Sequence, residues 1–129
     1  GVGPRRVGAL LLGRLGDEQA RSMLFRMIAA SGNQTRPPEI RMAATAALFR
    51  LGPPLPEDLG NLILGQVEDR DPRRRVQAAS CLAVVPGRKA LAALEVLLSD
   101  AEPMVRTAAA GAILSRPDSR QAAAAAVSN

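Results

Sequence analysis

Apolar side chains recur at steps of three and four along most of this chain, which is the spacing of one face of an α-helix. The two clearest runs are Ile40, Ala44, Ala47, Leu48 and Leu51, and then Leu91, Leu94, Leu97 and Leu98. No stretch alternates strictly between apolar and polar residues, so no strand is expected. The pattern predicts paired helices, the first of each pair over 4–15, 38–51, 72–85 and 103–115 and the second over 17–30, 56–68, 88–99 and 118–127.

The same short pattern of small residues ending in a large aliphatic one returns at nearly regular intervals. Residues 77–82 lie 31 positions before 108–113 and 34 positions after 43–48, and a degenerate copy occupies 7–12. A period of 20 to 50 residues is typical of stacked supersecondary units, each of which needs a neighbour to bury its apolar face. We therefore expect an all-α fold, a solenoid of about four helical hairpins in a single domain. The units are 1–35, 36–69, 70–100 and 101–129.

Capping residues support these boundaries. Asp71-Pro72 offers an N-cap oxygen followed by a proline at the first helical position. The other candidates are Pro38, Pro56 and Pro103 at first positions, Asp17 and Asp118 as caps of second helices, and Gly16, Gly52 and Gly87 where helices should stop. The recurring small residues suit a close approach of first helices, so Ala44, Ala78 and Ala109 are expected to face adjoining layers.

The composition narrows the class of protein but not its partner. The formal net charge is +5, the single cysteine is Cys81, and the chain has two Phe, no Trp, no Tyr and no His. Positive charge could attract nucleic acid, acidic proteins or anionic lipid, or could merely reflect a genome that favours Arg. One cysteine excludes an internal disulfide and fits a reducing compartment, so we expect a cytoplasmic protein. No apolar run approaches a membrane span. Because the chain starts without Met, close to its first repeat, we expect a fragment of a larger protein.

The sequence gives no indication of catalysis. Histidine chemistry is excluded because the chain has no His, and one cysteine cannot build a zinc site. Cys81 occupies a small-residue position of its repeat, where a buried structural thiol is expected rather than a nucleophile. We therefore expect no enzyme, no metal and no cofactor.

The repeats resemble the HEAT-like repeats of bacteria that are named after phycobilisome lyases. Asp100, Pro103, Val105 and Arg106, followed by Ala109-Ala110 and Ile113, carry the resemblance, and Asp69, Pro72 and Arg75 with Ala78-Ala79 and Leu82 repeat it. The resemblance implies a right-handed α-α superhelix. It also implies a structural ladder in which the aligned arginines pair with acids such as Asp69 and Asp100; these arginines are Arg5, Arg41, Arg75 and Arg106.

Three functions are open at this point. The first is a protein-interaction scaffold whose second helices form a concave face for a protein or peptide, with polar contacts from Arg21, Arg26, Glu57, Asp58, Gln66 and Glu95. The second is weak, salt-dependent binding of a nucleic-acid backbone through an anion patch of Arg70, Arg73, Arg74, Arg88 and Lys89, which could equally be a solvated helix start. The third is a lyase-type subunit acting on bilins, which the family name suggests.

Overall fold

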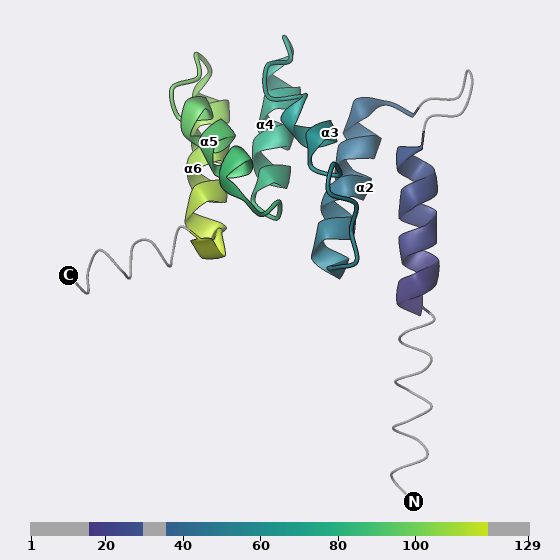
Figure 1. Ribbon diagram of the computed structural model, residues 1–129. Helices are drawn as coiled ribbons and strands as arrows, with labels where there is room; N and C mark the ends of the chain where they lie inside the picture. The colour runs from purple at the N-terminus through teal and green to yellow at the C-terminus, as the bar shows by residue number, and fades with distance from the viewer. Residues whose placement is uncertain (1–15, 30–35, 119–129) are drawn as a thin grey trace, which may run out of the picture.

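In the computed structural model, residues 16–29 and 36–118 are described, and every regular element in these two ranges is a helix (Figure 1). A helix covers 16–28. It is followed by α2 (Pro38–Leu51), α3 (Asn61–Leu64), α4 (Pro72–Leu82), α5 (Arg88–Leu97) and α6 (Pro103–Ser115). The all-α prediction is confirmed for this part of the chain. The predicted helix over 4–15 and almost all of the one over 118–127 lie outside the described residues.

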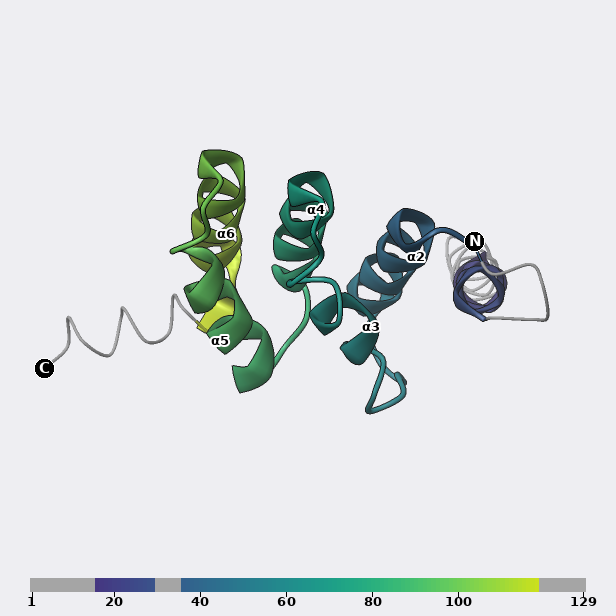
Figure 2. The same ribbon diagram turned by 90° about the horizontal axis from the view of Figure 1, so that it is seen from above.

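The helices form two layers. Figure 2 shows α2, α4 and α6 side by side in one row, with α3 and α5 on one side of that row. Helix α4 is the central element, because it packs against α2 and α6 and also against α3 and α5. The helix over 16–28 extends the row beyond α2 (Figure 1). Among the described residues no helix has both the length and the apolar character that a bilayer crossing demands.

The starts of the first-row helices follow from proline and one aspartate. Helices α2, α4 and α6 all begin at a proline, as predicted, and the missing proline N–H costs nothing there. The carboxylate of Asp71 accepts a hydrogen bond of 2.9 Å from the backbone N–H of Arg73, so Asp71 is the N-cap of α4. At the other end of α2, Gly52 has a φ of 86°, a conformation that favours glycine.

The second helix of the second unit is much shorter than predicted. Only Asn61–Leu64 is helical within the predicted range 56–68, and turns occupy the residues on both sides. Gly60 and Gly65 flank this helix, and glycine is a poor helix former. Tertiary packing adds a constraint, because a Cβ on Gly60 would lie 3.1 Å from Cγ1 of Val85. The missing side chain at Gly60 therefore leaves room for the side chain of Val85, and the two flanking glycines disfavour a longer α3.

Smaller boundary predictions also differ from the structure. Helix α4 ends at Leu82 rather than at residue 85, and α5 ends at Leu97 rather than at 99. Gly87, with a φ of 105°, precedes α5 as its N-cap residue instead of ending α4. Gly16 was expected to stop a helix and is itself helical, and Pro56 lies in the turn before α3.

The core lies between the two layers and is built from small and medium side chains. Ala78, Ala79 and Ala109 are fully buried, and only 2% of the surface of Ala44 is exposed. The large side chains that share one buried cluster with Ala78, Ala79 and Ala109 are Met42, Ile63, Leu82, Leu94 and Val105. The hydroxyl of Thr45, also fully buried, donates a hydrogen bond of 2.8 Å to the carbonyl of Arg41 and so leaves no polar atom unpaired there.

This packing makes a prediction about the buried alanines. Ala78→Leu adds volume at a position with no free surface, and we expect it to reduce the free energy of unfolding by about 1–3 kcal/mol. Ala92→Leu, at an exposed position of α5, is the matched control and should change it by less than about 0.5 kcal/mol. Urea denaturation followed by circular dichroism measures both variants. Equal stability of the two would contradict the close packing at Ala78.

Candidate functional site

Two turns 31 residues apart share one hydrogen-bond geometry. In the first, Oδ1 of Asp69 accepts from the backbone N–H of Asp71 at 2.8 Å, and in the second, Oδ1 of Asp100 accepts from that of Glu102 at 3.0 Å. Each turn is then closed by the arginine six positions after its aspartate. Nη1 of Arg75 donates to the carbonyls of residues 69 and 70 at 2.8 and 3.2 Å. Nη1 of Arg106 donates to those of residues 100 and 101 at the same two distances.

Arg75 also joins the two turns to each other. Its Nε and Nη2 donate to the two carboxylate oxygens of Asp100 at 2.9 and 3.0 Å, a bidentate pair that ties the first turn of α4 to the turn before α6. The hydrogen bond raises the pKa of Arg75 and lowers that of Asp100 below its usual value of 3.8. Both side chains are largely covered, with 15% and 11% of their surface exposed. Arg75 therefore acts as a structural link.

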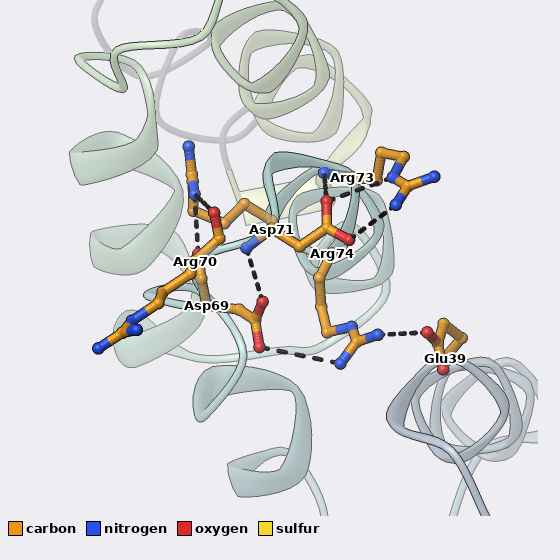
Figure 3. A network of polar contacts seen from close by, with 7 residues as sticks. Glu39, Asp69, Arg70, Asp71, Arg73 and Arg74 are labelled. Atoms are coloured by element: carbon orange, nitrogen blue, oxygen red, sulfur yellow. Dashed lines mark hydrogen bonds and ion pairs between the residues drawn. The ribbon is translucent and has the colours of Figure 1, made fainter.

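Two members of the predicted anion patch, Arg73 and Arg74, take part in a network of ion pairs (Figure 3). Arg74 pairs with Glu39 of α2 and lies 3.8 Å from the carboxylate of Asp69, so it connects α4 to α2. Arg73 pairs with the Asp71 carboxylate at 3.2 Å, and this hydrogen bond lowers the pKa of Asp71 and raises that of Arg73. The Arg73 side chain is 86% exposed, so its pair is screened by water and contributes little to stability.

The ion pairs change the electrostatic character of this surface. A carboxylate lies beside each of Arg73, Arg74 and Arg75, so most of the positive charge is compensated locally. Arg70 is exposed, and its carbonyl is used by Arg75. Arg88 and Lys89 are exposed at the start of α5.

The remaining predicted arginines reach backbone carbonyls or solvent. Nη1 of Arg21 donates to the carbonyls of Gly52 and Pro54 at 2.9 and 3.1 Å. Nε of Arg41 donates to the carbonyl of Ile28 at 3.0 Å, which ties α2 to the preceding helix. Arg26 is exposed, and Arg5 lies outside the described residues.

Arg116 is a buried charged residue that the sequence analysis did not single out. Only 2% of its side chain is exposed. Its five N–H donors are used in five hydrogen bonds of 2.5 to 3.2 Å, and the acceptors are the carbonyls of Leu82, Val85 and Gly87 and both carboxylate oxygens of Asp118. Arg116 thus clamps the turn between α4 and α5 to the end of α6. The sequence does hold a sign of this clamp, the Arg-Pro-Asp triplet at residues 116–118, which places a carboxylate two positions after the arginine. The sequence prediction gives Asp118 the role of a helix cap instead.

An open apolar hollow of about 620 Å³ lies beside this clamp, at the C-terminal ends of α2, α4 and α6. Its apolar lining comes from Phe49, Pro53, Leu55, Ala83, Val84, Val85, Pro86 and Pro117. Arg50 lies on the same wall, at the last turn of α2, and is exposed. We call this feature the Arg50 hollow.

A second hollow of about 450 Å³ adjoins the first near α3 and the start of α5. The two share four lining residues, namely Phe49, Leu55, Val85 and Pro86. Glu57, Asp58 and Lys89 add charged groups to the second hollow, and all three are exposed. We call it the Glu57 hollow. The two hollows together form a groove with an apolar middle and charged ends.

The thiol of Cys81 has the environment of a core residue. It is 8% exposed, burial raises its pKa, and its Sγ lies 3.8 Å from the carbonyl oxygen of Met42. A raised pKa leaves little of the nucleophilic thiolate at neutral pH. Within the described ranges, no three His, Cys, Asp or Glu residues come together in a way that could hold a metal ion.

The Arg75–Asp100 pair predicts a defined pH dependence of stability. Because the pKa of Asp100 is lowered in the folded state, its contribution is present above pH 3.8 and is lost as the pH falls through the folded value. Asp100→Asn should therefore be less stable than the wild type at pH 7, and the difference should shrink below pH 3.8. Glu95→Gln, at an exposed position of α5, is the control. Denaturation curves from pH 2 to pH 7 test this, and a difference that does not depend on pH would contradict it.

The Arg116 clamp predicts a large loss on truncation. Arg116→Met keeps much of the apolar stem but leaves three carbonyls and one carboxylate without their donors, so we expect the free energy of unfolding to fall by about 3 kcal/mol. Arg88→Met, at an exposed position, should cost less than about 0.5 kcal/mol. Chemical denaturation of the two variants provides the measurement. A loss at Arg116 no larger than that at Arg88 would show that the clamp is unimportant.

Comparison with protein-family models, with curated proteins and with solved structures finds no match to this chain. The resemblance of its repeats to HEAT-like hairpins therefore stays a prediction from the residues that carry it. The contacts and hollows described above are the basis for the functional proposal.

Proposed function

We propose that this protein is a non-catalytic scaffold that binds a protein or peptide in the groove formed by the Arg50 and Glu57 hollows, which runs from the C-terminal ends of α2, α4 and α6 to α3 and the start of α5. In this proposal the helical hairpins continue as a right-handed superhelix of the HEAT-like kind, and the protein works in the cytoplasm. The two-layer order of the described helices supports the superhelix, because α4 packs against both of its neighbours in the row, α2 and α6.

One observation carries the proposed function, namely the groove formed by the Arg50 and Glu57 hollows. Its middle is apolar and its ends are charged, which matches the apolar centre and polar rim of protein interfaces. A groove of this kind suits binding and offers no arrangement of nucleophile, base and orienting group. The groove therefore favours recognition over catalysis.

Nucleic-acid binding is the weaker alternative. It would depend on uncompensated Arg and Lys side chains that contact phosphates. Arg73, Arg74 and Arg75 each have a carboxylate within ion-pair distance, which reduces the charge available to a phosphate backbone. A bilin would need a pocket with aromatic walls, and Phe49 is the one aromatic residue in the groove.

Site-specific photo-crosslinking tests the scaffold proposal. A benzophenone amino acid at Asn61, exposed on α3, should give crosslinks to protein partners in an extract of the source cells. The same group at Thr107, exposed on α6 in the other layer, is the matched control and should give at least about fivefold less crosslinked product. Equal crosslinking from both positions, or crosslinks to nucleic acid alone, would contradict the proposal.

A further inference from the structure

We propose that the Arg50 hollow binds an extended peptide segment in which a large apolar residue lies next to an acidic one. The apolar side chain enters the hollow and the acidic side chain pairs with Arg50. This inference rests on the proposed scaffold function and specifies the chemistry of its partner.

Three backbone carbonyls on the wall of the hollow are already engaged. Arg21 of the preceding helix donates to that of Gly52, and Arg116 donates to those of Val85 and Gly87.

Donors are scarce on the same wall. Proline has no N–H, and three prolines line the hollow, at positions 53, 86 and 117. With these three carbonyls engaged and three N–H donors missing, the wall offers chiefly apolar contact. An apolar side chain that enters the hollow therefore displaces little water that is hydrogen-bonded to the backbone.

Arg50 is a charged group on the wall that a ligand can reach. Arg116 and Asp118 pair with each other and neutralise their charges. Arg50 is exposed, and among the described residues no hydrogen bond or ion pair engages its guanidinium. Arg50 is thus an available cation at the edge of an apolar surface, and its planar fork suits bidentate recognition of a carboxylate.

The groove is longer than a site for one side chain. The Arg50 hollow continues into the Glu57 hollow over Phe49, Leu55, Val85 and Pro86, so the apolar surface extends beyond one side-chain site. An extended chain can follow such a surface and place successive side chains along it. At the far end two carboxylates, Glu57 and Asp58, and one ammonium group, Lys89, line the hollow, so the excess of negative charge there favours a basic residue. The expected order in the peptide is acidic, apolar, basic.

A random decapeptide array tests this inference with the complete chain as the probe. The wild type should select peptides with Asp or Glu within three positions of Leu, Ile, Met or Phe. Arg50→Glu should weaken binding of the selected peptides by roughly tenfold, measured by fluorescence anisotropy. Arg36→Glu makes the same charge change at an exposed position outside the groove and should alter binding by less than about twofold. Circular dichroism checks that both variants keep their helices.

A charge-swap experiment separates recognition from loss of fold. If Arg50 pairs with the acidic residue, Arg50→Glu should bind a peptide in which Lys replaces that acid better than the wild type does. If the selected peptides are not enriched in Asp or Glu, the inference is overturned but the scaffold proposal stands. The same holds if the two Arg→Glu variants bind the selected peptides equally well. Selection of no peptide would overturn both. If the protein binds dodecanoate but no peptide, the hollow is a site for a small carboxylate. If the protein is a dimer that Arg50→Glu dissociates, the hollow is the site of a second copy. Either result would also overturn the inference.

Discussion

The close packing of first-row helices at small residues is the constraint on which the rest of the structure depends. Helix α4 buries Ala78 and Ala79 completely, and α6 buries Ala109 in the same way. With alanine at these positions, the backbones of neighbouring helices can approach more closely than larger side chains would permit. The helices α2 to α6 have at most 14 residues, and helices this short are marginally stable alone in water, so each depends on the burial that its neighbours provide. The row of α2, α4 and α6 is therefore the frame that places the turns and the groove.

Arginine has a consistent structural role at the ends of these helices. Arg21, Arg75, Arg106 and Arg116 each direct a guanidinium at two or more backbone carbonyls of a turn. Closely packed helices leave such carbonyls crowded and partly shielded from water, and an unpaired acceptor there would be costly. A planar fork with five donors meets this need better than the single ammonium of lysine. Much of the basic composition thus serves the fold, and the groove gains an apolar wall as a consequence.

The sequence predicted the regular parts of the fold well and the tertiary parts poorly. The bounds of α2 and α6 agree with the prediction because apolar periodicity and an N-terminal proline act locally. The predicted second helix over 56–68 is reduced to α3, where Gly60 and Gly65 flank the helix and the Val85 side chain fills the space beside Gly60, a contact that no local pattern reveals. The ion pairs of Arg74 and the burial of Arg116 depend on which turns meet in space. For this reason the spacing of residues could not predict that carboxylates neutralise the arginines of α4, nor that a groove forms beside Arg116.

Native-state hydrogen exchange of the backbone amides measures most directly whether α4 is the central, mutually buried helix. The account predicts that the amides in the second half of α4 exchange most slowly, with a free energy of opening close to that of global unfolding, and that the amides of α3 exchange much faster. Amides of α4 that exchange as fast as those of α3 would contradict it, because the helix would then open without disrupting its neighbours.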